Sequence, residues 1–161
     1  MSKQFDSSVY TMWDSFVEKN PEYSSKSFVS AWYFCDKEKD ANECAELVVL
    51  GIKQATTASQ WWFDKGFEKF PEIGELNIIT NWAGKAQAII ETTKIDKVPY
   101  NQVSEEYAKI EGEGDKSLGY WKRVHWDYYT REMKEYGEAP TEEMILICEQ
   151  FRTLWPAKEK A

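Results

Sequence analysis

The 161-residue sequence is poor in the residues from which most metal centres are built. It has a single histidine, His125, and three cysteines, Cys35, Cys44 and Cys148, with no CxxC spacing among them. A zinc site usually collects three or four such ligands at regular intervals, so we predict neither a metal site nor a cofactor. The GEGD segment at 112–115 also lacks the Lys-Ser/Thr ending of a phosphate-binding loop. These absences remove the commonest metalloenzymes and nucleotide hydrolases from consideration.

Long hydrophobic runs are absent as well. No stretch approaches the ~20 consecutive apolar residues that a membrane-spanning helix requires. The N-terminal segment MSKQFDSSVY lacks the apolar core and cleavage site of a secretory signal. Together with the odd number of cysteines, this predicts a cytoplasmic protein with free thiols. A disulfide between Cys35 and Cys44 is the alternative to burial of both as small hydrophobic residues.

Positive charge is outnumbered. Twenty basic and twenty-eight acidic residues give a net charge of −8, and such a surface repels a polyanion unless its positive charges are concentrated. A nucleoside carries no phosphate and feels little of this repulsion. The balance therefore favours a small ligand or a short, locally held RNA over DNA or a membrane.

Aromatic residues, in contrast, are abundant at 16% of the chain. Such side chains either fill a core, which is the commoner use, or stack on bases. Only aromatic residues in a charged context remain candidates for stacking. These are Trp82, Trp121 and Trp126.

Helical periodicity and capping residues predict four helices. The first covers 9–17 and ends at Asn20-Pro21, and the second covers 41–50, with Asp40 or Asn42 as its cap and Gly51 at its end. A short helix begins at Ser104 and runs through Ala108. The fourth spans about 118–136, with Ser117 as its cap and Gly137 at its end.

Strands are predicted where β-branched and aromatic residues lie between turn signals. The segments at 76–80 and 86–95 flank Gly84, which marks a hairpin turn, so they are expected to pair antiparallel. The remaining candidate segments are 27–34, 54–59 and 144–155, with a further helical turn or loop after the second of these. The whole pattern indicates one α+β domain.

Two segments are candidates for chemistry. In the first, Lys53 and Thr56 follow a helix end, and an amine beside a hydroxyl is a known way to activate a nucleophile. The second, EGEGDKSLGYWKRVHW at 111–126, places three carboxylates in a glycine-rich turn before a helix that carries Arg123 and His125. Simpler roles are open for both segments. Lys53 would be a surface lysine, Thr56 a strand former, Asp115 and Ser117 helix caps, and Arg123 with His125 a helix-surface pair.

The order of these segments resembles the ASCH domain family, in particular a bacterial branch with an extra N-terminal helix. The residues that carry the resemblance lie between about Trp32 and Trp155. They are Gly51-x-Lys53-x-x-Thr56, Ile73-Gly74-Glu75, and Ala108-x-x-Glu111-Gly112-Glu113-Gly114-Asp115 with Ser117-Leu118 and His125-Trp126.

The resemblance implies a PUA-like β-barrel flanked by helices, with a cleft for RNA or modified nucleosides. It also implies three units, namely an N-terminal helical extension at 1–31, the ASCH domain at 32–156 and a flexible tail at 157–161. Small members of the family include an amidohydrolase of N4-acetylcytidine that uses a Lys, a Thr and a Glu. By motif these are Lys53, Thr56 and Glu111, acting as proton acceptor, nucleophile and base-orienting group or acid. The ligand-binding candidates beside them are Trp82, Glu113, Asp115, Ser117, Arg123 and His125.

Three functions therefore stay open. The first is hydrolysis of an acylated nucleoside. The second is RNA binding without catalysis, through a basic patch of Lys53, Lys85, Lys122, Arg123 and Arg131. The third is a ribonuclease whose divalent metal is held by Glu111, Glu113 or Asp115, as reported for another family member.

Overall fold

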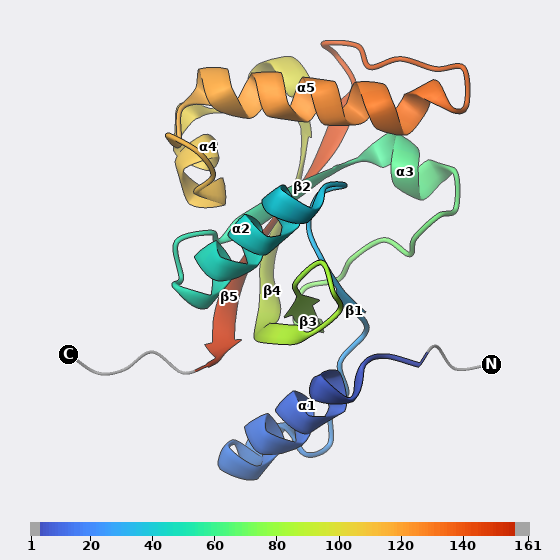
Figure 1. Ribbon diagram of the computed structural model, residues 1–161. Helices are drawn as coiled ribbons and strands as arrows, with labels where there is room; N and C mark the ends of the chain where they lie inside the picture. Colours follow the sequence, from blue (N-terminus) through green and yellow to red (C-terminus); the bar gives the residue numbers. More distant parts are fainter. Residues whose placement is uncertain (1–3, 157–161) are drawn as a thin grey trace.

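The computed structural model describes residues 4–156, and the predicted tail at 157–161 lies outside this range. Figure 1 shows helices arranged around a central sheet, with the helix nearest the N-terminus at one end and the longest helix at the other. No helix in the described range is long and apolar enough to cross a membrane. The elements in order are α1 (Ser7–Lys19), η1 (Pro21–Tyr23), β1 (Ala31–Trp32), α2 (Glu38–Val49), β2 (Ala55–Ser59), α3 (Gln60–Asp64), β3 (Leu76–Thr80), β4 (Ala86–Pro99), η2 (Tyr100–Gln102), α4 (Glu105–Glu111), α5 (Leu118–Lys134) and β5 (Ile145–Trp155).

The five strands form one sheet in the order β1-β3-β4-β5-β2. β1 pairs parallel with β3, whereas the other three pairings are antiparallel. Within the described residues, no hydrogen-bonded pairing joins the edge strands β1 and β2, so the sheet is open. The predicted α+β fold is confirmed, with an open sheet in place of a closed barrel.

Helix α1 closes one end of the sheet. Asp6 caps it by accepting a hydrogen bond from the Ser8 amide, which satisfies one of the free donors at a helix start. Val9 and Phe16, seven residues apart on one face, are buried against Ile78 and Ile89 of the sheet. The predicted extension is therefore part of a hydrophobic core and contacts the same sheet as the rest of the chain.

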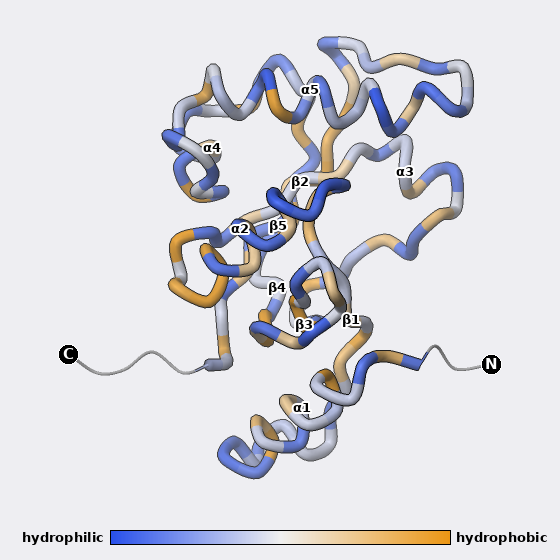
Figure 2. The backbone as a smooth tube through the Cα atoms, in the orientation of Figure 1, coloured by the Kyte–Doolittle hydropathy of each residue, from blue (hydrophilic) through white to orange (hydrophobic). Residues whose placement is uncertain are grey.

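Helix α2 packs on the sheet through its second half. Figure 2 shows it changing from hydrophilic at its start to hydrophobic toward its end. Cys44, Ala45 and Val48 are buried against strand residues that include Ile79 and Phe151. Near the start of the helix, the Asn42 side chain accepts a hydrogen bond of 2.9 Å from the Trp82 amide in the β3–β4 turn.

Helices α4 and α5 form a third core with the far halves of β4 and β5. Trp121 and Tyr129 of α5 pack against Leu146 and against Ala108 of α4. Ser117 caps α5 as predicted, accepting from the Tyr120 amide. This packing fixes the connection at 112–117 between two anchored helices.

Several predicted boundaries differ from the structure. Only Ala31–Trp32 of the predicted strand at 27–34 pairs with a neighbour, because β1 meets β3 at just two positions. Helix α2 begins at Glu38, ahead of the predicted caps Asp40 and Asn42, and its capping position is held by Lys37 without a side-chain hydrogen bond. β4 continues to Pro99 because β5 pairs with it along its length.

Candidate functional site

A cavity of about 660 Å³ opens between the sheet, α2, α5 and the segment that follows β2. Its lining is strongly acidic, with nine carboxylate side chains against three from lysine and arginine. The carboxylates are Asp36, Asp40, Glu43, Glu68, Glu75, Glu111, Glu113, Glu132 and Glu149, and the cations are Lys53, Lys69 and Arg131. Eight aromatic residues contribute to the remaining wall, namely Trp32, Tyr33, Phe34, Trp62, Phe63, Phe67, Tyr120 and Tyr128.

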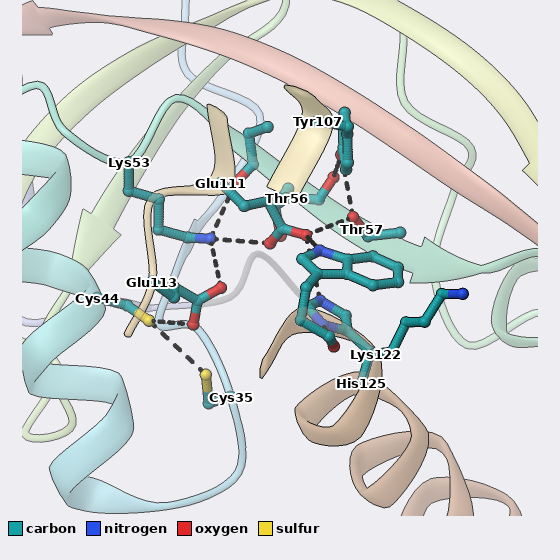
Figure 3. A network of polar contacts seen from close by, with 12 residues as sticks. Cys35, Cys44, Lys53, Thr56, Thr57, Tyr107, Glu111, Glu113, Lys122 and His125 are labelled. Carbon is teal, nitrogen blue, oxygen red and sulfur yellow. Dashed lines mark hydrogen bonds and ion pairs between the residues drawn. The ribbon is translucent and has the colours of Figure 1, made fainter. Parts of the chain in front are cut away.

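Lys53 lies at the floor of this cavity with 1% of its side chain exposed. Gly51, with φ +74°, ends α2 in a left-handed turn that suits glycine and directs the chain toward β2. The Lys53 ammonium donates to the Ala55 carbonyl at 2.8 Å and to Glu111 and Glu113 at 3.1 Å each. Burial alone would lower the pKa of Lys53, but the carboxylates of Glu113 and Glu111 outweigh it and raise the pKa. Lys53 is therefore a permanent cation whose three protons are all engaged (Figure 3).

Glu111 ends α4 and is the anion at the centre of the network. Besides Lys53, its carboxylate accepts from the Thr57 hydroxyl at 2.8 Å and from the indole of Trp121, and it lies 3.2 Å from His125 Nε2. Burial alone would raise the pKa of Glu111, but the neighbouring His125 and Lys53 lower it by a larger amount. The pKa of Glu111 is therefore well below its usual range. Because donors surround this carboxylate, Glu111 is suited to positioning its neighbours.

His125 stacks on the Trp121 ring at 4.0 Å between centroids, one helical turn along α5. Its Nδ1 lies 2.8 Å from the Trp121 carbonyl, while its Nε2 faces the Glu111 carboxylate. Both ring nitrogens therefore face hydrogen-bond acceptors. Only the protonated imidazolium can donate a hydrogen bond from both nitrogens at once. Burial lowers the pKa of His125, and the adjacent Glu111 charge more than reverses that effect and raises it.

The two neighbouring threonines of β2 have different surroundings. Thr57 shares a hydrogen bond of 3.0 Å with the Tyr107 hydroxyl and donates to Glu111. Thr56 lines the cavity and is partly exposed, and its backbone carbonyl accepts from Tyr107 at 2.9 Å. Thr57 also lines the cavity and is partly exposed, but its hydroxyl is engaged by Glu111 and Tyr107.

Glu113 belongs to the glycine-rich connection and lines the cavity with 17% of its side chain exposed. The preceding Gly112 has φ +71°, and a Cβ there would lie 2.6 Å from the Ile52 carbonyl oxygen, so this approach requires glycine. One carboxylate oxygen of Glu113 accepts from Lys53, and the other accepts from the Cys44 thiol at 3.0 Å. A hydrogen bond to Cys35 and burial raise the pKa of that thiol.

Four predicted ligand-binding residues are placed elsewhere and do not line the cavity. Asp115 and Ser117 act as the capping pair of α5, since Asp115 accepts from the Ser117 amide at 2.8 Å. The exposed Arg123 lies over the Tyr120 ring, 5.6 Å from its centroid. Trp82 lies in the β3–β4 turn and packs on Tyr33.

The remaining candidates for base stacking and for the basic patch also lie mostly away from the cavity. Trp121 and Trp126 belong to the core of α5. Among the predicted basic patch, only Lys53 and Arg131 line the cavity, and Arg131 is held by both oxygens of Asp36 at 2.8 and 3.0 Å. The five residues therefore do not meet at the cavity.

The roles of Thr57, Tyr107 and Trp121 had no separate signal in the sequence. Each contacts Glu111 or a residue bonded to it, from β2, α4 and α5 respectively. The pair of threonines in QATTAS was visible, but only the strand register distinguishes them.

Comparisons with known proteins agree with this architecture. A family model described as the ASCH domain matches residues 30–154. The solved ASCH domain from Lactobacillus crispatus JV V101 is 36% identical, with a TM-score of 0.88 over 94% of this chain and 96% of that chain. Protein EF3133 from Enterococcus faecalis V583, assigned to DUF984, is 30% identical, with a TM-score of 0.80 over 92% of this chain and 88% of that one.

A more distant structure shares the fold alone. The hypothetical protein PH0355 is 16% identical, with a TM-score of 0.51 over 78% of this chain and 98% of that chain. Curated protein sequences yield no match.

Proposed function

Because the chain belongs to the ASCH domain family, which is generally linked to RNA binding, we propose that its cavity binds one unphosphorylated nucleoside and that the chain hydrolyses an N4-acylated cytidine there. The observation that carries the proposal is the composition of the cavity wall. Nine carboxylates against three lysine and arginine side chains oppose a phosphate group, while eight aromatic residues offer faces for a planar base.

The size of the cavity supports a single nucleoside. Pockets for drug-sized ligands have volumes of roughly 300–1,000 Å³, and about 660 Å³ falls within that range. Trp62, Phe63 and Phe67 stand on the segment after β2, and the rings of Trp62 and Phe67 pack with centroids 4.6 Å apart. A base stacked on one aromatic side chain gains about 1–3 kcal/mol.

The chemical roles follow from which groups remain available to a ligand. Lys53 has all three protons engaged and a raised pKa, so we do not assign it the role of proton acceptor. Glu113 lines the cavity and is partly exposed, so we assign it that role. Glu111 and Lys53 are then positioning residues that hold Glu113, Thr57 and His125.

In the proposed reaction, Thr56 Oγ forms a bond to the acyl carbon while Glu113 takes the hydroxyl proton. The C–N4 bond then breaks, and the same proton passes from Glu113 to the departing amino group of cytidine. Glu113 then takes a proton from water as the water oxygen bonds to the acyl carbon. The bond between that carbon and Thr56 Oγ breaks, the proton passes from Glu113 to Oγ, and the acyl group leaves as a carboxylic acid. The positive charges of Lys53 and His125, which line the same cavity as Thr56, favour the oxyanion that forms in both steps.

The two other functions are less well supported by the site. RNA binding through a basic patch would need its cations free and on one surface, whereas Lys53, Lys85 and Arg131 are paired with carboxylates and lie on three different segments. A metal-dependent ribonuclease would hold its metal through Glu111, Glu113 or Asp115. Asp115 does not line the cavity, whereas the ligand atoms of Glu111, Glu113 and His125 lie within 4.8 Å of one another. Lys53 and protonated His125 already neutralise Glu111, so we do not propose Glu111 and His125 as metal ligands.

The test measures binding and turnover separately. Calorimetry compares cytidine with cytidine 5′-monophosphate and a short RNA, and absorbance follows deacylation of N4-acetylcytidine by the wild type, Thr56→Val and Thr130→Val. Thr130 is an exposed residue of α5 and serves as the matched control.

We expect cytidine to bind more tightly than its monophosphate, and turnover to be lost in Thr56→Val alone. Tighter binding of the phosphorylated ligands would overturn the nucleoside proposal. Binding without turnover by the wild type, or full turnover by Thr56→Val, would overturn the hydrolytic step.

A further inference from the structure

Two thiols and a carboxylate converge on the cavity wall beside the Lys53 network. Cys35, in the loop between β1 and α2, lies with its Sγ 3.8 Å from Cys44 Sγ on α2, and Glu113 Oε1 is 3.0 Å from Cys44 Sγ. The three donor atoms all lie within 4.8 Å of one another, and all three residues line the cavity. Figure 3 shows Cys35 and Cys44 on the far side of Glu113 from Glu111.

The geometry points to a zinc site formed by Cys35, Cys44 and Glu113, with its fourth position open to the cavity. Two sulfurs bound to zinc at about 2.3 Å with a tetrahedral angle lie about 3.8 Å apart. The separation of Cys35 and Cys44 is that distance. A carboxylate oxygen bound at about 2.0 Å would lie about 3.5 Å from each sulfur, so Glu113 needs to move by only about half an ångström relative to Cys44.

Lys53 supports this site through the other oxygen of Glu113. It holds Oε2 at 3.1 Å, which leaves Oε1 directed toward the thiols. Groups that bind and orient a metal ligand in this way are typical of functional metal sites. Two thiolates, one carboxylate and one zinc ion would together leave a net negative charge. The Lys53 ammonium offsets that charge.

The backbone of Cys35 gives an independent reason. Its φ of +68° lies in the left-handed region, which a residue with a side chain rarely adopts. Strained conformations of this kind concentrate at functional sites. Here the conformation belongs to the loop that brings Cys35 to the thiol of Cys44.

Two soft thiolates with one carboxylate favour Zn²⁺ over Mg²⁺ or Ca²⁺, which prefer oxygen ligands alone. Binding releases one proton from each thiol to solvent, so the affinity is expected to rise with pH. The open fourth position would take water or a polar atom of a ligand, as in zinc sites with three protein ligands. The site shares Glu113 with the proposed function, in which Glu113 is the proton acceptor, whereas Thr56 is not one of its ligands.

The experiment titrates the reduced, anaerobic full-length chain with Co²⁺ and then displaces it with Zn²⁺. Free thiols are counted on the purified chain before it is reduced. The variants are Cys35→Ala, Cys44→Ala and Cys148→Ala, in which the buried Cys148 of β5 is the matched control, and a thermal unfolding curve of each checks that it folds.

We expect three free thiols, one cobalt ion per chain with tetrahedral thiolate absorption, and loss of that absorption in Cys35→Ala and Cys44→Ala but not in Cys148→Ala. Magnesium at the same concentration should not displace the cobalt. The proposal is overturned by absent absorption, by absorption that survives either substitution in a folded variant, or by a single free thiol, which would indicate a Cys35–Cys44 disulfide. Deacylation by Thr56 is measured separately and without added metal, so a failure of metal binding and a failure of deacylation are distinguishable although both proposals use Glu113.

Discussion

Replacing Lys53 by methionine removes a buried cation while keeping a side chain of similar length. The ammonium contacts Glu111 and Glu113 at 3.1 Å each, and the side chains of Lys53 and Glu111 are 1% and 2% exposed. Removing one partner of a buried pair costs about 3–5 kcal/mol, because the other charge is left without compensation. Glu111 keeps His125, Thr57 and Trp121 as partners, so we expect the low end, about 3 kcal/mol. For a chain of this size that lowers Tm by roughly 6–12 °C.

Urea unfolding of Lys53→Met across pH measures this loss. The pKa of Glu111 lies below its ordinary value of 4.5 in the folded protein, so its contribution to stability is present above that pH and is lost as the pH falls. The difference between wild type and variant should therefore be largest above about pH 5 and shrink in acid.

Two further variants decide the interpretation. Lys85→Met, which removes an exposed ion pair with Asp6, should stay close to the wild type. Adding Glu113→Gln to Lys53→Met should restore part of the lost stability, because one uncompensated carboxylate is removed. If Lys53→Met lowers the free energy of unfolding by less than about 1 kcal/mol, the pair contributes no more than an exposed ion pair, and the reasoning is refuted.

Two other predictions test the surroundings of the site. Burial raises the pKa of Glu132 to about 7, so its contribution to stability is complete below pH 4.5 and is lost as the pH rises through about 7. Glu132→Gln should match the wild type in acid and be more stable above about pH 7 in urea unfolding, and equal stability throughout would contradict this. Gly112→Ala should destabilise by more than about 1 kcal/mol, since its Cβ meets the Ile52 carbonyl, whereas Gly119→Ala, in open space near the start of α5, should be neutral or stabilising. Thermal unfolding separates the two, and similar shifts would argue against the close approach at Gly112.

Much of the fold was predictable because it depends on local signals. The spacing of Val9 and Phe16 predicted α1, the Ser117 cap predicted the start of α5, and Gly84 predicted the β3–β4 turn. The extent of β1 was not predictable, because it depends on how many residues of a distant strand lie alongside it. The same holds for the open sheet, since strand order is a property of the tertiary structure.

The sequence by itself determined which residue types gather near the site. Lys53 after a helix end, Glu111 and Glu113 around Gly112, and His125 on the following helix were all visible as a pattern. Asp115 and Ser117 were also recognisable as capping residues, and that reading describes their place in the structure.

Only the tertiary structure decided what each group can do. Two carboxylates beside a buried Lys53 keep it protonated, and this balance of burial and charge has no signature in the local sequence. Strand register decided that Thr57 contacts Glu111, and helix packing decided that Trp121 does. The approach of Cys35, Cys44 and Glu113 likewise joins three segments of the chain, because side chains distant in sequence meet only where packing brings their backbones together.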